Sequence, residues 1–348
     1  MEPVKKVVVY GAYGHTGRFV VKELLRRSLP VVVAGRNGSK IDSLAKVVGI
    51  EGVQFDIEDA EGFDRILADK SALINCAGPF LDTAPALVKH AIRSGVPYFD
   101  VAAEQRVVYE LFSEYARAEI DSLVVPGVAF YGQLGELLIA ETLGDMTDAD
   151  VTLAIGLDSW EPTVGTRKTG SKNPGLRRHL IDGQLEEREP FPGRLWTFAG
   201  RLGEQAMLSL ALSEAVLVEQ SKRVKNLRTY INEGPIKDLV DESTPAPTPS
   251  DEFGASSQIW EMDVEITDGG LTRRASLTGR DIYAVSGQLV VHAVETLLSN
   301  GVHLTGIRPL SQVVAPQTFL DSFIGSSAYI ERGATDPRAQ PPPRVGGN

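Results

Sequence analysis

The sequence predicts an α/β fold: a doubly wound parallel sheet, then a second α+β domain inserted before a C-terminal helix that returns to the first. Two observations support this prediction of the fold class. Short apolar runs alternate with helical patterns through the first 130 residues, and a glycine-rich turn joins the first run to the first helix. After about Gly127 the alternation stops, which indicates a change of domain.

The apolar runs of the first part are continuous and rich in valine, as in parallel strands that are covered on both faces. The expected strands are Val7–Tyr10, Val31–Ala34, Val53–Asp56, Ala72–Cys76, Tyr98–Ala102 and Leu123–Val125. Helical spacing covers Arg18–Arg27, Ala84–Ser94 and Val107–Arg117. Strands separated by such crossovers predict the doubly wound sheet.

The second part has mixed patterns. We expect a helix over Leu134–Leu143, a strand over Val151–Leu157, a buried helix over Glu204–Arg223, and an apolar helix over Gln288–Leu298. Ile259–Ile266 and Leu271–Thr278 alternate around a Thr-Asp-Gly-Gly turn, which predicts an antiparallel hairpin. Ser243–Ser257 holds three prolines and is expected to be a surface loop.

These elements divide the chain into four parts. Residues 1–128 form the expected dinucleotide-binding domain, and residues 129–283 the substrate or dimerisation domain. Residues 284–328 are a helical segment that packs back on the first domain. Residues 333–348, rich in proline and glycine, are expected to be a disordered tail.

Composition limits the class of protein. Of 348 residues, 43% are hydrophobic and 23% charged, which is ordinary for a globular chain. The formal net charge of −11 argues against nucleic acid as a partner. The single cysteine, Cys76, allows no internal disulfide. We find no targeting segment and no apolar run of the roughly 18 residues that a membrane span needs, so we expect a soluble cytoplasmic protein.

The strongest local motif is the glycine-rich turn between the first strand and the first helix. Its spacing is GxxGxxG, with Gly11, Tyr13, Gly14, His15, Thr16 and Gly17 as candidate cofactor-binding residues. Glycines there let backbone N–H groups approach a phosphate, and the helix N-terminus favours the negative charge. The alternative is a plain chain reversal. Within this strand–helix alternation, the motif favours a Rossmann-type nucleotide site.

The second strand distinguishes the two dinucleotides. NAD sites usually carry a carboxylate at its end, to bind the ribose 2′-OH. Here Arg36 and Asn37 stand there, with Lys40 following. A guanidinium can form bidentate bonds with a 2′-phosphate. The alternative is a solvated loop arginine, but the pattern predicts NADP(H) as cofactor.

The third and fourth strands end in further candidate residues. Asp56 and Ile57 would flank the adenine, although Asp56 could equally cap the next helix. The fourth strand is followed by Cys76, Ala77, Gly78, Pro79 and Phe80, small or stiff residues suited to the nicotinamide end. Cys76 has no base beside it in sequence, which favours a buried structural thiol over a nucleophile.

Several familiar chemistries are not indicated. The sequence has no Tyr-x-x-x-Lys pair and no Gly-x-Ser-x-Gly elbow. Its five histidines lack metal-ligand spacing, and one cysteine cannot build a structural zinc site. We therefore expect no metal.

The order of these motifs resembles the saccharopine dehydrogenase-like NADP-binding family. The resemblance rests on Gly11–Gly17, Ala34-Gly35-Arg36, Asn75–Phe80, and Gly95–Asp100 with Glu104. It covers the first 130 residues well, and Gly279–Tyr283 and Gly306–Pro309 are similar to the ends of such proteins. It implies an oxidoreductase that transfers a hydride to or from a C=N, C=O or activated C=C bond. Ala102-Ala103 departs from the family's glycine before the glutamate.

The family arrangement also implies that Asp100 and Glu104 lie at the ligand-binding edge of the sheet. Either could orient substrate or nicotinamide, or instead Asp100 caps a helix and Glu104 is solvated. Tyr131 and Tyr283 have hydroxyls that could donate a proton, or they pack with satisfied hydroxyls. We take Glu104, Tyr131 and Lys168 as candidate catalytic residues.

Lys168 lies in a basic stretch. From Pro162 to Ile181 there is no acidic residue, while Arg167, Lys168, Lys172, Arg177, Arg178 and His179 fall there. We hypothesise that this stretch faces the cofactor cleft and attracts an anionic substrate. A solvated loop or a subunit contact would explain it equally well.

The prediction is thus an NADP(H)-dependent oxidoreductase that acts on a small molecule. The main alternative is a non-catalytic NADP(H)-binding sensor or scaffold, supported by the lack of an assigned proton donor. An adaptor that uses the Ser243–Ser257 loop is a weaker alternative. The hairpin over Ile259–Thr278 could extend a sheet across a homodimer.

Overall fold

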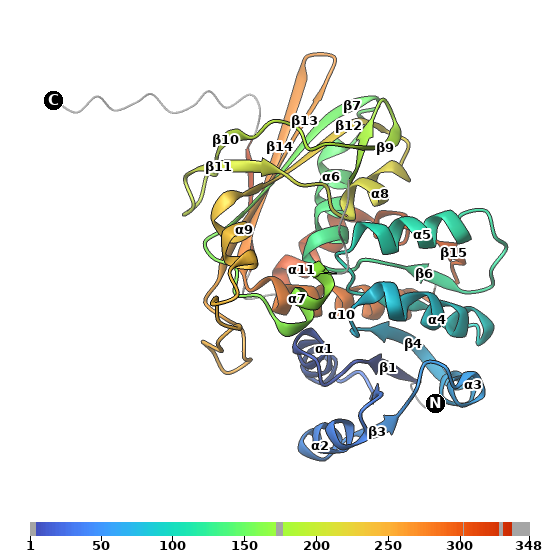
Figure 1. Cartoon of the computed structure of the whole chain (residues 1–348). Coiled ribbons are helices and arrows are strands. Elements are labelled where there is room, and N and C mark those ends of the chain that lie inside the picture. The colour runs from blue at the N-terminus through green and yellow to red at the C-terminus, as the bar shows by residue number, and fades with distance from the viewer. Residues whose placement is uncertain (1–4, 172–176, 302, 327–329, 336–348) are drawn as a thin grey trace.

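The computed structural model describes residues 5–171, 177–301, 303–326 and 330–335. The described chain forms two β-sheets, which Figure 1 shows in its lower and upper halves. The lower sheet carries the N-terminal residues and the upper sheet most of the remainder. Helices near the middle of the chain and near its C-terminal end lie between the two.

The first sheet is wholly parallel, with strand order β15-β6-β5-β4-β1-β2-β3. Its strands are β1 (Lys6–Tyr10), β2 (Val31–Gly35), β3 (Glu51–Gln54), β4 (Lys70–Asn75), β5 (Tyr98–Asp100), β6 (Leu123–Val125) and β15 (Gly306–Ile307). This order reverses between β1 and β4, as in Rossmann folds. The predicted fold class is confirmed, and all six predicted strands are present.

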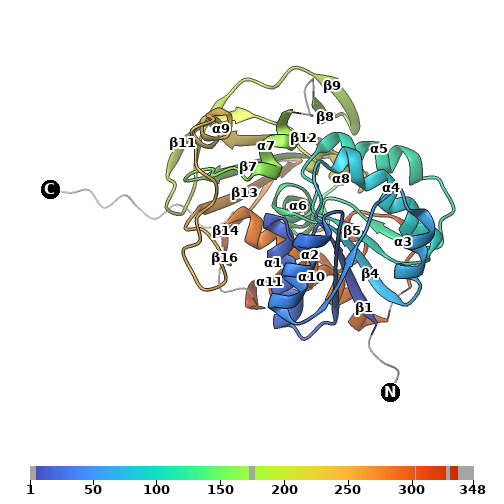
Figure 2. The same cartoon turned by 60° about the horizontal axis from the view of Figure 1, so that its bottom comes forward.

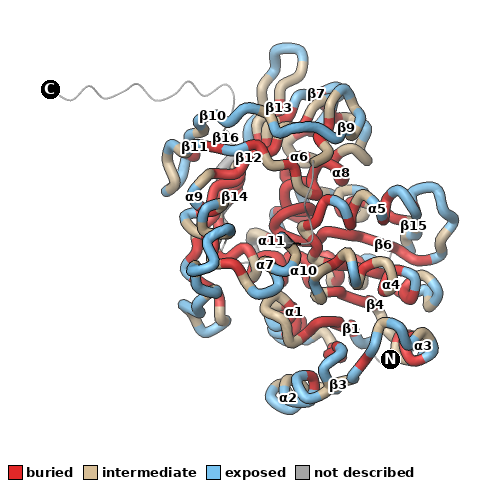
Figure 3. The backbone as a smooth tube through the Cα atoms, viewed as in Figure 1, coloured by how far each residue is buried: buried red, intermediate tan, exposed pale blue. Residues whose placement is uncertain are grey.

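Helices cover both faces of this sheet, which explains its continuous apolar runs. They are α1 (His15–Arg26), α2 (Gly38–Val48), α3 (Ala60–Leu67), α4 (Phe80–Arg93) and α5 (Gln105–Tyr115). Figure 2 shows α1 and α2 on one face and α3, α4 and α5 on the other. Val7 and Val9 accordingly belong to one buried cluster and Val8 to the opposite one. Figure 3 shows these strands buried along much of their length.

The second sheet is mixed, with order β10-β11-β12-β7-β13-β14-β16 and with β8 paired to β12 and β9. Its strands are β7 (Ala149–Leu157), β8 (Arg177–Ile181), β9 (Gln184–Arg188), β10 (Arg194–Thr197), β11 (Glu204–Ser209), β12 (Val224–Asn232), β13 (Ile259–Asp268), β14 (Leu271–Arg280) and β16 (Ile330–Thr335). The predicted hairpin is β13–β14. Gly269 and Gly270 form its two-residue turn, with φ of +53° and +89°.

Shorter helical segments accompany the second sheet. They are a kinked turn η1 (Phe130–Leu134), in which Tyr131 and Gly132 are not helical, and the helices α6 (Gly135–Leu143), α7 (Val164–Ser171), α8 (Glu214–Glu219) and α9 (Glu233–Val240). Helix α6 packs against β13, α8 and η1. The loop over Ser243–Ser257 is irregular, as predicted.

Two predictions for the second part are wrong. Glu204–Arg223 is not one helix: it forms strand β11 and then the short helix α8. Buried Met207 lies between exposed neighbours, so this stretch follows a strand period, and β11 pairs with β12. Residues 333–335, assigned to a disordered tail, end strand β16, while 336–348 lie outside the described residues.

The C-terminal part returns to the first sheet. Helix α10 (Ile282–Asn300) packs along α1, β15 pairs with β6, and a short turn η2 (Leu310–Gln312) and α11 (Pro316–Ser326) follow. Helix α10 starts earlier than predicted because the Asp281 carboxylate accepts hydrogen bonds from the N–H groups of Tyr283 and Ala284. By length and composition alone, α10 could cross a membrane, but 67% of that stretch is buried inside the protein, as in a core helix.

Candidate functional site at the junction of the two sheets

A cavity of about 1040 Å³ lies at the carboxyl ends of the first-sheet strands, where open α/β sheets bind ligands. Its floor comes from the turns that follow β1, β2, β3, β4 and β5. Helix α7, the start of α10 and residues Ala246 and Pro247 close it from the other side. Both parts of the chain therefore build this pocket.

Gly11 places two of these turns in direct contact. Its φ is +80°, and a Cβ there would lie 2.8 Å from the carbonyl carbon of Cys76 and from the Ala77 nitrogen. Gly11 and Gly14 line the cavity, but Gly17 does not. A Cβ on Gly17 would lie 2.9 Å from Ala12 Cα, so this glycine lets α1 pack closely on β1.

His15 and Tyr13 form side walls of the pocket. The His15 ring contacts Phe19 and Tyr283 edge-on, with centroid distances of 5.3 and 5.1 Å. Burial lowers the pKa of His15. The negative charge of Asp281 raises it, and the positive charge of Arg18 lowers it further. The Tyr13 ring covers Gly35, and Lys40 Nζ lies 5.5 Å from its centre.

The end of β2 presents cations to the cavity. Arg36 and Lys40 line it, as does Thr16 of the glycine-rich turn, and both cations are exposed. Asn37 does not line it: its side chain accepts a 3.0 Å hydrogen bond from the Lys40 N–H and caps α2.

The ends of β3 and β1 meet on the same side. Asp56 and Ile57 line the cavity. Asp56 is not the cap of α3, because Asp59 fills that position and accepts from Gly62 N. Burial raises the pKa of the nearby Tyr10 to about 12, with further contributions from Asp56 and Tyr13 and an opposing one from Arg36.

A buried polar network holds the loop after β4, whose residues Cys76, Ala77, Gly78, Pro79 and Phe80 all line the cavity. Asn75 donates to the Tyr98 hydroxyl (3.1 Å), and that hydroxyl donates to Asp100 (2.9 Å). Asp100 also accepts from Ala102 N and Gly127 N. Asp100 therefore neither lines the pocket nor caps α5. Burial raises the pKa of the Cys76 thiol, which keeps it inert.

Glu104 lines the pocket and is only 3% exposed, so it is not the solvated acid of the alternative reading. Its Oε1 accepts a 3.1 Å hydrogen bond from the Phe80 N–H. Burial raises the pKa of Glu104, and the negative charge of Asp100 raises it further. Hydrogen bonds from the N–H groups of Phe80 and Glu104 and from the hydroxyl of Thr169 lower it. Glu104 thus links the first domain to α7.

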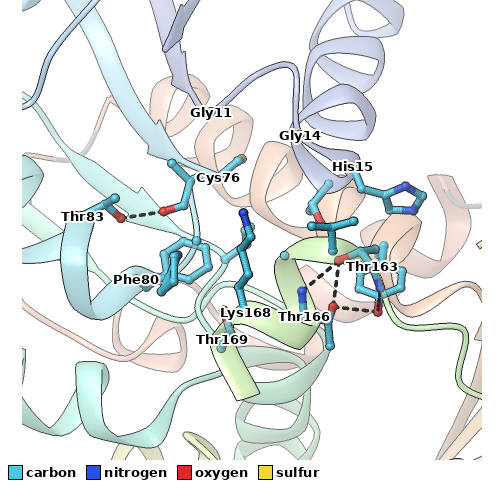
Figure 4. A pocket seen from close by; sticks show the side chains of 18 of the residues that line it. Gly11, Gly14, His15, Cys76, Phe80, Thr83, Thr163, Thr166, Lys168 and Thr169 are labelled. Atoms are coloured by element: carbon cyan, nitrogen blue, oxygen red, sulfur yellow. Dashed lines mark hydrogen bonds between the residues drawn. The ribbon is translucent and has the colours of Figure 1, made fainter. Parts of the chain in front are cut away.

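The roof of the pocket is a hydroxyl network on α7 and α10. The Tyr283 hydroxyl is 2.9 Å from Thr166 Oγ1 and accepts from Trp160 Nε1 (3.1 Å). Thr163 Oγ1 is 2.9 Å from Thr166 Oγ1. In Figure 4 the Lys168 side chain extends from α7 toward the turn that carries Gly11 and Gly14. Lys168 and Tyr131 both line the cavity.

The basic stretch as a whole does not face the cleft, contrary to the hypothesis. Arg167 instead donates to the carbonyls of Leu239, Asp241 and Thr244, and so fixes the loop that carries Pro247. Arg178 pairs with Glu187 at 3.1 Å. His179 is buried on β8, and Lys172 lies outside the described residues. Arg177 begins β8 and does not line the pocket, so among the described residues of the stretch Lys168 is the basic residue that does.

Sequence reasoning missed most of the roof. Thr163, Gly165, Thr166, Thr169 and Pro247 all line the cavity. The Gly-Thr step of residues 165–166 was a signal, since hydroxyls and glycines recur where ligands approach. Pro247 follows no local pattern that could have revealed its role.

In the described part of the chain, no group of three or more His, Cys, Asp or Glu side chains is placed to hold a metal ion.

Comparison with protein families finds one match in the first domain. Residues 7–121 match the family model described as the saccharopine dehydrogenase NADP binding domain. A probable mitochondrial saccharopine dehydrogenase-like oxidoreductase of Arabidopsis thaliana is 23% identical over 295 residues. That alignment covers 80% of this chain and 56% of the plant protein, so the chain spans little more than half of that relative. These matches confirm the resemblance drawn from the motifs.

Two solved structures share the fold over nearly the whole chain. Saccharopine dehydrogenase (L-Glu forming) from Saccharomyces cerevisiae superposes with a TM-score of 0.64 at 12% identity, over 95% of this chain and 100% of that one. Homospermidine synthase from Legionella pneumophila, solved in complex with NAD, has a TM-score of 0.65 at 11% identity, over 99% and 94%. The likeness to these two structures therefore extends over the second domain as well as over the first.

Proposed function

We propose that this chain is an NADP(H)-dependent oxidoreductase that transfers a hydride to or from a C=N, C=O or activated C=C bond. One observation carries the proposal. A glycine cradle that a Cβ would fill opens into a cavity whose outer end holds Arg36 and Lys40, without a carboxylate at the end of β2. A 2′-phosphate needs such cations, and a free ribose 2′-OH usually meets a carboxylate.

The cofactor-binding residues divide into three groups. The turn over Gly11–Thr16 would hold the pyrophosphate, because its backbone and the start of α1 favour anions. Arg36 and Lys40 would bind the 2′-phosphate, with Asp56 and Ile57 beside the adenine. The loop over Cys76–Phe80 would flank the nicotinamide. When bound, the cofactor would supply the hydride.

The candidate catalytic residues surround the nicotinamide end. Glu104 would position the Phe80 loop against the cofactor through its hydrogen bond to the Phe80 N–H. Lys168, which enters from α7, would hold an anionic group of the substrate. Tyr131 would present its hydroxyl as a proton donor from the inner wall of the pocket. We also propose domain boundaries at residues 128, 283 and 328. They separate the cofactor-binding part, the substrate-binding part and the C-terminal helices that return to the first domain.

The cofactor assignment is tested by titrating the purified protein with NADPH and NADH. We expect NADPH to bind at least about tenfold more tightly, the worth of one charge-assisted hydrogen bond. Arg36→Ala should abolish that difference, whereas Lys46→Ala, a loss of an exposed cation elsewhere on α2, should keep it. Equal affinities in the wild type, or a preference that survives Arg36→Ala, would contradict the proposal.

Turnover is tested with NADPH and a panel of imines, semialdehydes and enoyl thioesters. Oxidation of NADPH with any member supports an enzyme, and Lys168→Met should raise KM for anionic members more than for neutral ones. The matched control is Lys237→Met, an exposed cation on α9. Tight NADPH binding without turnover across the panel would favour the sensor alternative.

Assembly and location are separate proposals. The β13–β14 hairpin does not offer an edge for extending the sheet across a homodimer, because β13 pairs with β7 and β14 with β16. We propose instead that a homodimer uses the hairpin tip, which projects beyond the second sheet in Figure 1 and where Leu271 is 50% exposed. Light scattering on the wild type and on Leu271→Lys tests it, since the variant should dissociate. We propose a cytoplasmic location, although the plant relative is named as probable mitochondrial; microscopy of the tagged protein decides between these.

A further inference from the structure

One side chain of the pocket wall and one behind it are buried without side-chain hydrogen-bond partners. Within the described ranges the Tyr131 hydroxyl finds no partner, and the Glu214 carboxyl oxygens have only the backbone N–H groups of Glu214 and Gly132 near them. Glu214 is 0% exposed and Tyr131 is 5% exposed. Because buried polar groups are nearly always paired, an unpaired hydroxyl in the pocket wall and a buried acid that has only backbone N–H groups near it call for a functional reason or a bridging water.

The backbone places Glu214 against the turn that carries Tyr131. Gly132, the residue after Tyr131, has a φ of +136°, and a Cβ there would lie 2.8 Å from Ser213 Oγ. Ser213 Oγ in turn donates to the Tyr131 carbonyl at 3.3 Å. A Cβ on Gly135 would lie 3.2 Å from Glu214 Cγ. The start of α8 is therefore packed on η1 and α6, on the far side of Tyr131 from the pocket.

The other side of Tyr131 faces the pocket roof. Its ring lies 5.4 Å from that of Trp160, whose Nε1 donates to the Tyr283 hydroxyl. Tyr283 is less buried than Tyr131 and belongs to the hydroxyl network with Thr166. Burial raises the pKa of Tyr131, and the charges of Tyr283 and Glu214 add to this. Tyr131 therefore stands between helix α8, which carries Glu214, and the hydroxyl network of the roof, which includes Tyr283.

We propose that Glu214, Tyr131 and Tyr283 form a proton relay that supplies the pocket from its inner wall. This inference rests on the proposed function. When a substrate C=N or C=O carbon has gained a hydride, its heteroatom takes the proton of the Tyr283 hydroxyl. Tyr131 returns a proton to Tyr283, and the Glu214 carboxylic acid returns one to Tyr131, with water bridging the gaps. Glu214 is left as the carboxylate and regains its proton back along the relay, from water that enters the pocket after the product has left.

The electrostatics of Glu214 suit a group that exchanges protons at neutral pH. Burial raises the pKa of Glu214 from 4.5 to about 7, although hydrogen bonds from the backbone N–H groups of Glu214 and Gly132 lower it. Several charged groups on the elements packed against α8 have partners of their own: Arg106 with Glu110 on α5, Glu136 of α6 with Ser311, Arg178 of β8 with Glu187 of β9, and Arg228 of β12 over the Phe191 ring. His179 of β8 is buried as well, with no hydrogen-bond partner for its ring nitrogens among the described residues, and burial lowers its pKa, which favours the neutral imidazole.

Glu136 provides a matched control for Glu214. It is also a buried glutamate, and burial raises its pKa to about 7, but its carboxylate is bonded to Ser311 and it does not line the pocket. We expect Glu214→Gln to lower kcat by about 100-fold, the lower end of the range of general acid catalysis. NADPH affinity should be unchanged, and the limb of the pH profile near pH 7 should disappear. Glu136→Gln should keep the wild-type profile.

A second readout does not depend on turnover. The infrared C=O band of the protonated Glu214 carboxyl, isolated as wild type minus Glu214→Gln, should titrate near pH 7, and Tyr131→Phe should shift its midpoint. An unmoved midpoint, or a wild-type pH profile in Glu214→Gln, would overturn the relay in a protein that binds NADPH normally. Failure to bind NADPH would instead contradict the proposed function.

Discussion

The backbone N–H of Phe80 donates a 3.1 Å hydrogen bond to Oε1 of Glu104. This bond ties the loop after β4 to the residue that precedes α5, so two adjacent strands present their ends as one surface. Thr169 of α7 approaches both the loop and the acid: a Cβ on Gly78 would lie 3.4 Å from its hydroxyl, and that hydroxyl forms a hydrogen bond with the Glu104 carboxylate. A single side chain thereby joins the floor of the pocket to its roof.

Substituting Glu104 should separate its geometric role from its charge. Glu104→Gln keeps an acceptor for the Phe80 N–H, so we expect NADPH affinity to fall less than threefold. Glu104→Ala leaves that buried N–H unpaired, which costs about 1–3 kcal/mol, and NADPH affinity should fall at least tenfold. Fluorescence titration measures both. Equal losses in the two variants would show that charge, and not the hydrogen bond, matters.

Gly11→Ala should disrupt the contact between the β1 and β4 turns. The new Cβ would lie 2.8 Å from the backbone of Cys76 and Ala77, so overpacking of about 1–3 kcal/mol adds to the cost of a positive φ. Gly49→Ala is the control: its φ is +70°, and nothing lies within 4 Å of the added Cβ. We expect NADPH binding to be lost in the first variant and kept in the second. Similar behaviour of the two would contradict the close-contact argument.

Arg167→Met should loosen the loop that closes the pocket. Arg167 donates to the carbonyls of Leu239, Asp241 and Thr244, and the following loop brings Pro247 to the cavity. We expect faster proteolysis within residues 241–257 and weaker NADPH binding, with about 1–3 kcal/mol lost in stability. Arg106→Met, which removes an exposed ion pair on α5, is the comparison. Cleavage at the wild-type rate would exclude this anchoring role.

Glu136→Gln should change how stability depends on pH. Burial raises the pKa of Glu136 to about 7 from 4.5, so the folded state binds more protons between these values, and the free energy of unfolding falls as pH rises. Glutamine carries no such charge. The variant should therefore gain on the wild type from pH 5 to pH 8, by on the order of 3 kcal/mol. Urea unfolding measures this, with exposed Glu110→Gln as control; parallel curves would refute it.

The first domain was predictable because its signals are local. Each strand buried on both faces shows as an unbroken apolar run, and Gly11 and Gly14 mark the turn between strand and helix. Helices α2 and α3 were missed. Helix α2 buries only Ile41 fully, so its apolar period is weak, and its start is set by the side chain of Asn37.

The second domain and the roof depend on contacts between residues far apart in sequence. Met207 is buried because β11 pairs with β12, which the composition of Glu204–Arg223 alone cannot reveal. Arg167 and Lys168 are neighbours in a basic stretch, yet one binds backbone carbonyls and the other enters the pocket. Glu214 gave no signal in the sequence, since only folding brings it behind Tyr131.

Strand β15 completes the edge of the first sheet with residues that lie nearly two hundred positions after β6. During synthesis, the dinucleotide-binding half would leave the ribosome long before Gly306–Ile307 and helix α10, which packs along α1. Until those segments are synthesised, the nascent N-terminal domain would have an open sheet edge at β6 and an uncovered face on α1. The sheet of the first domain is therefore completed only after Gly306–Ile307 and α10 have been synthesised.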